Sequence, residues 1–187
     1  MIRSEAQLVL ADGTTFEGEA IGAVPTDGIT TGEVVFNTAL SGYQEIITDP
    51  SYAGQIITFT YPHIGNYGVA DADDESTGPA TRGIIVRDLA RRHSNWRAET
   101  DLESFLERHG VAGITGVDTR RLTRHLRQHG SMPGAFGTAD ETDLTSAAAA
   151  APSTEGIDLV ATVTTAMPYT VGTGPRRVVA YDFGIKR

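Results

Sequence analysis

Short runs of β-branched and aromatic residues constrain the fold of this sequence more than any other feature. In the first half of the chain they lie at 34–36, 56–59 and 83–86, and glycine, proline and asparagine bound them. Such side chains pack well on a pleated sheet, whereas the bounding residues favour turns. The runs therefore predict buried strands, and we expect sheet to dominate this half.

The N-terminal segment predicts a β-hairpin. Residues 7–10 and 15–21 are apolar or alternate between apolar and polar, and Asp12-Gly13 lies between them. Asp-Gly supplies the positive φ angles that a tight hairpin turn needs. The chain is therefore expected to open with two antiparallel strands.

The second half of the chain predicts helices. Residues 100–103 match the S/T-x-x-E capping box, and Gly110 suits the left-handed position that follows a helix. A second helix is expected from Asp118 to the terminator Gly130, and a third over 142–151, before Pro152. We expect these helices to cover the sheet.

Composition excludes several classes of function. The chain has 187 residues, a net charge of −9 and a pI of about 4.9, which argues against nucleic acid as a partner. No apolar run approaches the roughly 20 residues needed to cross a bilayer, and the start lacks a secretory signal, so we expect a cytoplasmic protein without a membrane partner. The absence of cysteine excludes disulfides, Cys-ligated zinc and a thiolate nucleophile within these residues.

The last forty residues predict a domain boundary. Residues 168–175 contain two glycines between two prolines and have the composition of a linker. Residues 178–181 have the pattern of a buried strand, yet the sequence offers no further strand to pair with it. We therefore expect the sequence to end just inside a second domain, with a first domain at 1–150, a connecting segment at 151–176 and the start of the second domain at 177–187.

Two charged clusters have simple interpretations. The carboxylates of 71–75 could bind a metal for hydrolysis, but an EF-hand loop needs Gly and Glu where Ser76 and Arg82 stand, so a solvated loop is favoured. The expected helix at 118–130 is strongly basic. A solvated helix face is favoured over an anionic partner for its cationic side chains, which are Arg120, Arg121, Arg124, His125 and Arg127.

A polar turn is the strongest candidate for a site. Between the apolar pairs Ile46-Ile47 and Ile56-Ile57 stands Asp49-Pro50-Ser51-Tyr52, in which the aspartate can bond amides two residues on and the proline sets φ. Ser51 would then lie at an exposed tip with hydrogen-bonding capacity to spare. A ligand contact and the capping of a hairpin both explain this pattern, whereas a Ser51–His63 catalytic pair lacks an identifiable acid.

Longer stretches resemble the small chain of glutamine-hydrolysing carbamoyl-phosphate synthase. The similarity runs from Gln7 to the last residue, in motifs that follow one another in the family's order. They are GEVVFNTALSGYQEIITDPSYAGQIITFTYPHIGNYG at 32–68, RGIIVRDL at 82–89, GITGVDTRRLTRHLR at 113–127, GIDLV at 156–160 and VVAYDFGIKR at 178–187.

The resemblance implies a fold and a reaction. The fold class would be α/β, with a three-layer β/β/α sandwich of the swivelling-domain type. The first strand of a class I glutamine amidotransferase domain, which carries a Cys-His-Glu catalytic set, would follow it. The whole enzyme, a ligase, would make carbamoyl phosphate from glutamine, bicarbonate and two ATP molecules for arginine and pyrimidine synthesis. ATP and magnesium would belong to the large chain, the partner, and this chain would need no cofactor or metal.

The resemblance also assigns a role to one residue. Ser51 matches the family's serine that contacts bound glutamine, and no catalytic residue falls within the sequence. The expected function is therefore a component that is inactive alone, completes a glutamine site and assembles with the large chain. The alternative is a stand-alone interaction module of the same fold.

Overall fold

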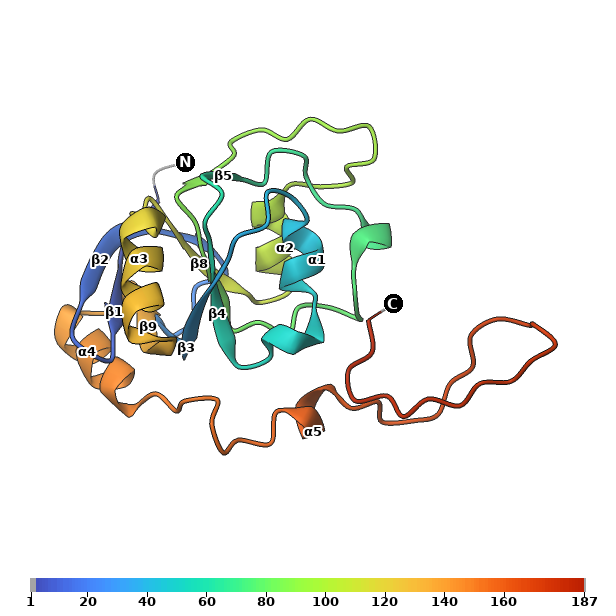
Figure 1. Cartoon of the computed structure of the whole chain (residues 1–187). Helices are drawn as coiled ribbons and strands as arrows, with labels where there is room; N and C mark the ends of the chain where they lie inside the picture. Colours follow the sequence, from blue (N-terminus) through green and yellow to red (C-terminus); the bar gives the residue numbers. More distant parts are fainter. Residues whose placement is uncertain (1–2, 187) are drawn as a thin grey trace.

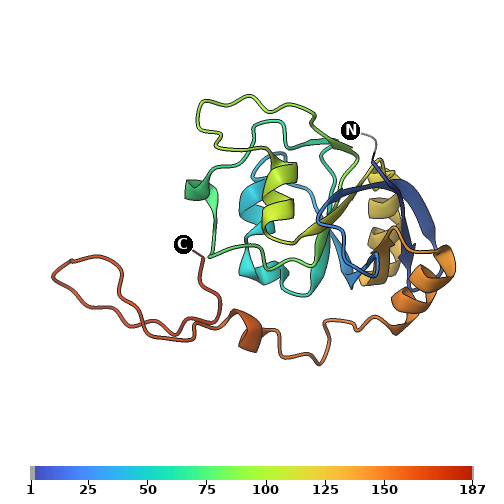
Figure 2. The same ribbon diagram turned by 180° about the vertical axis from the view of Figure 1, so that it is seen from behind.

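The computed structural model describes residues 3–186. Most of the chain forms a barrel of strands with helices packed around it, whereas part of the segment after α4 projects away from the barrel as a long loop (Figures 1 and 2). The barrel strands are β1 (Glu5–Leu10), β2 (Thr15–Gly22), β3 (Ile29–Asn37), β4 (Gln55–Phe59), β6 (Gly83–Ile85), β8 (Ala112–Thr115) and β9 (Met132–Gly137). The helices are α1 (Tyr43–Ile47), α2 (Leu102–Arg108), α3 (Thr119–His129), α4 (Glu141–Ala150) and α5 (Val160–Val163). A separate two-stranded sheet consists of β5 (His63–Ile64) and β7 (Asp88–Leu89).

The barrel has a parallel and an antiparallel part. Around the barrel the strands follow the order β1-β2-β8-β6-β4-β3-β9. Neighbouring strands from β8 to β3 pair in parallel, and the other neighbours pair antiparallel. Because β9 pairs with both β3 and β1, the sheet closes on itself and leaves no open edge.

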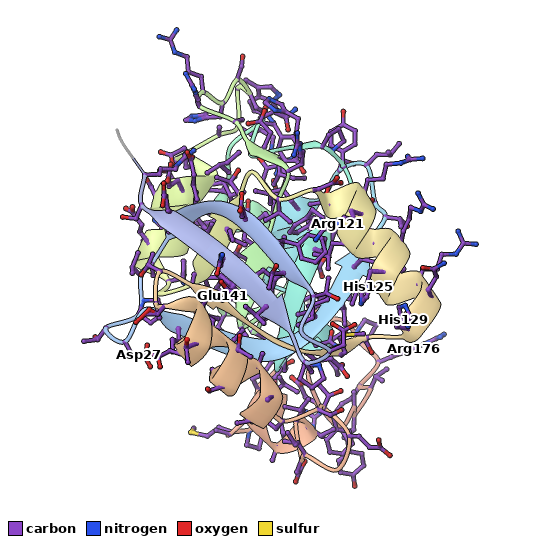
Figure 3. All side chains as sticks on the ribbon, turned by 90° about the vertical axis from the view of Figure 1, so that its left-hand side faces the viewer. Asp27, Arg121, His125, His129, Glu141 and Arg176 are labelled. Atoms are coloured by element: carbon purple, nitrogen blue, oxygen red, sulfur yellow. The ribbon has the colours of Figure 1, made fainter. Side chains whose placement is uncertain are left out.

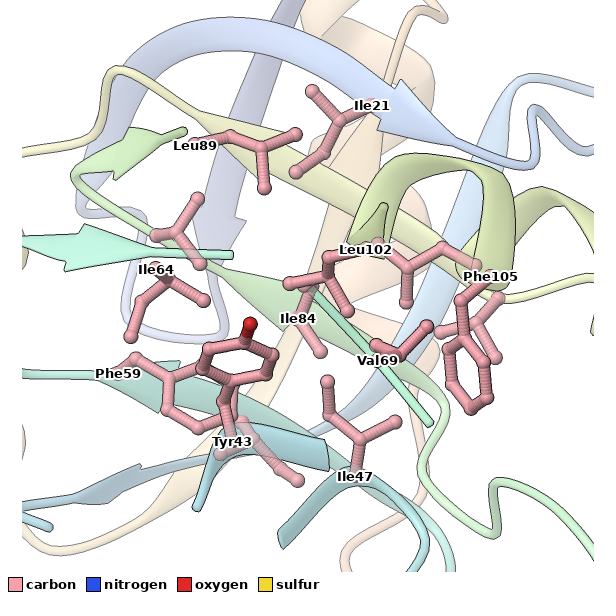
Figure 4. Packing of buried hydrophobic residues seen from close by; sticks show 14 residues of the cluster. Ile21, Tyr43, Ile47, Phe59, Ile64, Val69, Ile84, Leu89, Leu102 and Phe105 are labelled. Carbon is pink, nitrogen blue, oxygen red and sulfur yellow. The ribbon is translucent and has the colours of Figure 1, made fainter. Parts of the chain in front are cut away.

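Alternate residues of the strands serve two hydrophobic clusters. Ile56 and Ile85 belong to a cluster to which all seven barrel strands contribute, which identifies it as the barrel interior. Their neighbours Ile57 and Ile84 belong to an outer cluster that includes side chains of α1 and α2 (Figure 4). The near-continuous apolar runs of the sequence are thus explained, because parallel strands buried on both faces need apolar residues at every position.

Two other helices complete the packing. Leu122 and Leu126 of α3 join the interior cluster, whereas Leu144 and Ala148 of α4 cover Val9 on the outside of the antiparallel part. Among the described residues, none of the helices combines the length and the apolar character needed to cross a bilayer.

The predicted strands and helices of the first 150 residues are confirmed in type. The hairpin turn has Gly13 at φ 83°, and the amide of Thr14 donates to Asp12 Oδ1 at 2.9 Å. One detail of the helices was wrong. The N-cap of α2 is Asp101 and not Thr100, because Asp101 Oδ1 accepts the backbone N–H of Ser104 at 2.8 Å.

The expected layer architecture was wrong. The structure has a mixed, closed seven-stranded barrel where a β/β/α sandwich was expected, although the α/β class is confirmed. The physical reason is the additional strand β9. Its sequence MPGAFG lies in the helical half of the chain and has no strand pattern. Because β9 pairs with β1 on one side and with β3 on the other, it joins the two edges that an open sheet would have.

The strand expected at 178–181 is not formed. Val178, Val179 and Tyr181 are each more than 80% exposed, and the described part of the segment 151–186 has no regular structure beyond α5. A strand is stable only when a neighbour satisfies its backbone groups, and no strand lies beside this segment.

Candidate functional site

The polar turn begins directly after α1. Asp49 is the N-cap of a single 3-10 turn at Pro50–Tyr52, and its Oδ1 accepts the backbone N–H of Ser51 at 2.8 Å. The predicted bond to an amide two residues on is therefore confirmed. The hairpin alternative was wrong, because Ile46-Ile47 lies in α1 and β3 pairs in parallel with β4.

The Asp49 carboxylate is held as a charged group. It is 8% exposed, and its Oδ2 lies 2.9 Å from Lys186 Nζ. Burial raises its pKa, but the Ser51 amide and the Lys186 ammonium outweigh this effect, so that the pKa lies below its ordinary value. A negative charge thus supports the turn from its inner side.

The third support of the turn is Tyr52. Its hydroxyl oxygen accepts a hydrogen bond from Asn37 Nδ2 at 2.9 Å, and Asn37 ends β3. Its ring packs against the outer hydrophobic cluster. The turn is therefore fixed to the barrel, while the side chain of Ser51 stays exposed.

The C-terminal segment lies against this turn. A Cβ atom at Gly184 would stand 3.2 Å from Pro50 Cβ, and Lys186 pairs with Asp49. Upstream, Thr154 donates to Glu33 Oε2 at 2.8 Å, and a Cβ atom at Gly54, just before β4, would stand 3.2 Å from Leu159 Cδ2. The segment therefore contacts the barrel side near Thr154 and Leu159, projects away from the barrel as a long loop after α5, and returns to the Ser51 turn at its end (Figure 1).

A catalytic Ser51–His63 pair is not formed. His63 lies in β5 of the small sheet, and its Nδ1 is 2.8 Å from Asp88 Oδ2. No hydrogen bond joins it to Ser51 among the described residues. The turn thus presents an exposed hydroxyl without a general base, an arrangement that can bind a polar ligand.

The carboxylates of 71–75 hold a loop together. Asp73 pairs with Arg97 at 2.5 Å, and Asp74 Oδ1 accepts from Gln44 Nε2 at 2.6 Å. No group of three or more His, Cys, Asp or Glu suited to a metal ion occurs in residues 3–186. The ion pair of Asp73 and the hydrogen bond of Asp74 explain these two carboxylates as supports of the loop.

Part of the basic face of α3 fastens the first hairpin. Arg121 stacks over Phe16 at 4.1 Å and donates to the carbonyl of Thr15, and His125 Nε2 lies 2.6 Å from Asp12 Oδ2 (Figure 3). Burial raises the pKa of Asp12, but the hydrogen bonds from Thr14 and His125 outweigh this effect, so that the pKa lies below its ordinary value. These two side chains serve the fold, which fits the simpler interpretation of the helix.

Sequence reasoning missed the buried residue Gln44. Its Oε1 accepts the N–H of Ala70 at 2.9 Å, and its Nε2 donates to the carbonyl of Ala70 at 2.7 Å. It thereby joins α1, which leads into the Ser51 turn, to the loop that follows β5. A single polar residue in a mixed run carries no periodic signal, so only the tertiary structure reveals this role.

Comparisons with known proteins give consistent matches over this chain. The family model of the carbamoyl-phosphate synthase small chain, CPSase domain, matches residues 8–136. A carbamoyl phosphate synthase small chain from Synechococcus sp. is 50% identical over 201 residues, covering 99% of this chain and 51% of the relative. The small chain from Escherichia coli K12 is 48% identical over 207 residues, covering 100% of this chain and 53% of the relative.

The structural comparison is weaker. A peptidase M28 precursor from Shewanella amazonensis matches with a TM-score of 0.38 and 12% identity over 73% of this chain and 35% of its own, which carries no argument. The chain spans about half the length of the curated relatives it matches. On the family match and the identities near 50%, this chain belongs to the carbamoyl-phosphate synthase small chain family.

Proposed function

We propose that this chain acts as the N-terminal part of a glutamine-hydrolysing carbamoyl-phosphate synthase small chain. Two findings support this proposal: the family match, and relatives that are about twice as long as this chain. In the complete enzyme, a cytoplasmic ligase, glutamine, bicarbonate and two ATP molecules yield carbamoyl phosphate for arginine and pyrimidine synthesis. Residues 1–150 form the N-terminal domain, 151–176 connect, and 177–187 begin the amidotransferase domain.

The chemistry divides between this chain and its partners. A thiolate of the amidotransferase domain attacks the side-chain amide of glutamine, and this chain, which has no cysteine, supplies no nucleophile. The ammonia passes to the large chain, which uses ATP and magnesium. Enclosing the ammonia between tightly packed subunits protects it from protonation and loss to bulk water.

The role of this chain at the glutamine site rests on the Ser51 turn. The observation that carries this proposal is the placement of an exposed, fixed hydroxyl beside the segment 182–186, through which the chain would continue into the amidotransferase domain. Ser51 is then positioned to donate to, or accept from, a polar group of glutamine. Asp49 and Tyr52 hold the turn in place and take no part in the chemistry.

Removing the hydroxyl tests this role. In the full-length small chain assembled with its large chain, we expect Ser51→Ala to weaken glutamine binding by about 1 kcal/mol, a roughly fivefold rise in KM, because one neutral hydrogen bond is lost. Steady-state glutaminase kinetics measure it.

The matched control is Ser41→Ala, because Ser41 is also an exposed serine and none of its described contacts is a side-chain hydrogen bond. Its KM should equal that of the parent protein. An unchanged KM in Ser51→Ala refutes the contact, whereas a fall in kcat at constant KM contradicts a role confined to binding.

A further inference from the structure

The loop at residues 90–99, between β7 and α2, presents an exposed aromatic side chain. Trp96 is the single tryptophan of the chain, and its side chain is 92% exposed, the largest fraction among the exposed large hydrophobic residues described. The loop lies at the edge of the domain in both views (Figures 1 and 2), as the yellow-green segment at the top. We call it the Trp96 loop. In this position the indole contributes nothing to the core of the protein.

The backbone of the Trp96 loop is fixed on both sides of the tryptophan. The amide of Ser94 donates to the carbonyl of Asn66 at 3.0 Å, and the amide of Glu99 donates to that of Val69 at 2.8 Å. At the tip, the amide of Ala98 donates to the carbonyl of Asn95 at 3.1 Å and closes a turn around Trp96.

The side chains beneath the tip reinforce this order. Asn95 Oδ1 accepts the backbone N–H of Arg97 at 3.1 Å, and the guanidinium of Arg97 pairs with Asp73 at 2.5 Å. A Cβ atom at Gly68 would stand 2.7 Å from Ala98 Cβ, so the loop packs closely on the chain below. A fixed loop loses little conformational entropy when a partner binds its tip.

The charge around the tryptophan differs from that of the whole chain. The loop contains Arg91, Arg92 and Arg97 with one carboxylate, Glu99, in a protein whose net charge is −9. All three arginines are exposed. Tryptophan and arginine are the residues most enriched among those that dominate binding energy at protein interfaces, and a cationic border favours an anionic partner surface.

We propose that the Trp96 loop is a docking surface for a protein partner that offers an apolar pocket for the indole, bordered by carboxylates for the arginines. On the proposed function, that partner is the large chain. The indole fills the pocket and supplies most of the affinity, while Arg91 and Arg92 set orientation and association rate. The Ser51 turn is a separate site, so the two roles can be tested independently.

The test uses the full-length small chain and measures its affinity for the large chain by titration at two salt concentrations. We expect Trp96→Ala to weaken binding at least tenfold and Trp96→Phe to retain most of it. Arg92→Glu should weaken binding several-fold, and more strongly at low salt. Val24→Ala is the control, because Val24 is also an exposed apolar residue, at 59%, and it should change nothing.

The outcomes separate this inference from the proposed function. If the parent small chain binds the large chain and Trp96→Ala binds equally well, the docking surface is refuted and the proposed function stands. If the parent protein itself does not bind the large chain, the proposed function is refuted. The large chain is then also refuted as the partner of the Trp96 loop. Loss of self-association alone in Trp96→Ala, measured by sedimentation, would overturn the inference in favour of a second copy of this chain.

Discussion

The side chain of Gln44 joins α1 to the loop at 70–75 by hydrogen bonds. It is 2% exposed, and its amide satisfies both backbone groups of Ala70 while it also donates to Asp74. Buried backbone groups that lose such a partner cost the full free energy of their desolvation. The residue therefore stabilises the loop at 70–75 and, through α1, the position of the Ser51 turn.

Replacing Gln44 by leucine tests this account at the residue scale. We expect the free energy of unfolding to fall by about 1–3 kcal/mol, because the buried backbone N–H of Ala70 loses its acceptor, while the carbonyl of Ala70 keeps only the N–H of Asp73, at 2.9 Å. Urea denaturation followed by circular dichroism measures the change. Gln128→Leu is the matched control, since Gln128 is exposed on α3 and should shift stability by no more than about 0.5 kcal/mol. Equal losses in the two variants would contradict the role of Gln44.

The elements differ in how far sequence reasoning can reach them. The strands β4 and β6 were predictable because they are buried on both faces, and a strand of this kind needs the run of apolar, β-branched residues that both sequences contain. The strand β9 was not, because it contains a proline and two glycines, which disfavour strands locally. The segment Ile46-Ile47 shows the opposite case. Its β-branched residues favour a strand, but in the structure they lie in α1 and pack this helix on the outer cluster. Tertiary packing decides such short segments, and local propensity cannot reveal it.

The start of α2 gives a test at the element scale. Asp101→Ala should lower the free energy of unfolding at pH 7 by about 1 kcal/mol, because the amide of Ser104 loses its capping acceptor. Thr100→Ala, at the residue that the capping-box pattern favours, should cost less than about 0.5 kcal/mol. Urea denaturation of both variants decides between the two caps, and a larger loss for Thr100→Ala would contradict the structure.

The same cap predicts a dependence on pH. Burial raises the pKa of Asp101, but the hydrogen bonds from Ser104 outweigh this effect, so the folded-state pKa lies below its ordinary value. Because the pKa of Asp101 is lower in the folded state, the charged cap contributes fully to stability above about pH 4, the range of the pKa in the unfolded chain. This contribution is lost as the pH falls through the pKa of the folded state. The difference in stability between the parent protein and Asp101→Ala should therefore be constant from pH 7 to pH 5 and shrink below pH 4. A difference that grows at acidic pH would contradict this sign.

At the scale of the whole molecule, one residue lies on the seam that closes the barrel. Gly137 is aligned with Gln7 of β1 and with Ile29 of β3, so both ladders of β9 meet at it. Its φ is 152°, and a Cβ atom there would stand 1.8 Å from the carbonyl oxygen of Gly28. Closure depends on pairing between segments that lie about a hundred or more residues apart, which explains why the sequence did not indicate a barrel. The Ser51 turn could be located beforehand because its Asp-Pro signal is local.

Substituting Gly137 by alanine should therefore open the seam. We expect a loss of about 3 kcal/mol or more in the free energy of unfolding, because the backbone of β9 or of Gly28 must move and break pairing on at least one side. Gly130→Ala is the control for backbone strain, since Gly130 has φ 89° but nothing within 4 Å of its Cβ position, and it should cost about 1 kcal/mol. Urea denaturation gives both values, and hydrogen exchange should show faster exchange in β1 and β3 for Gly137→Ala only. Equal losses and unchanged exchange in the two variants would mean that the close approach at Gly28 does not hold the barrel closed.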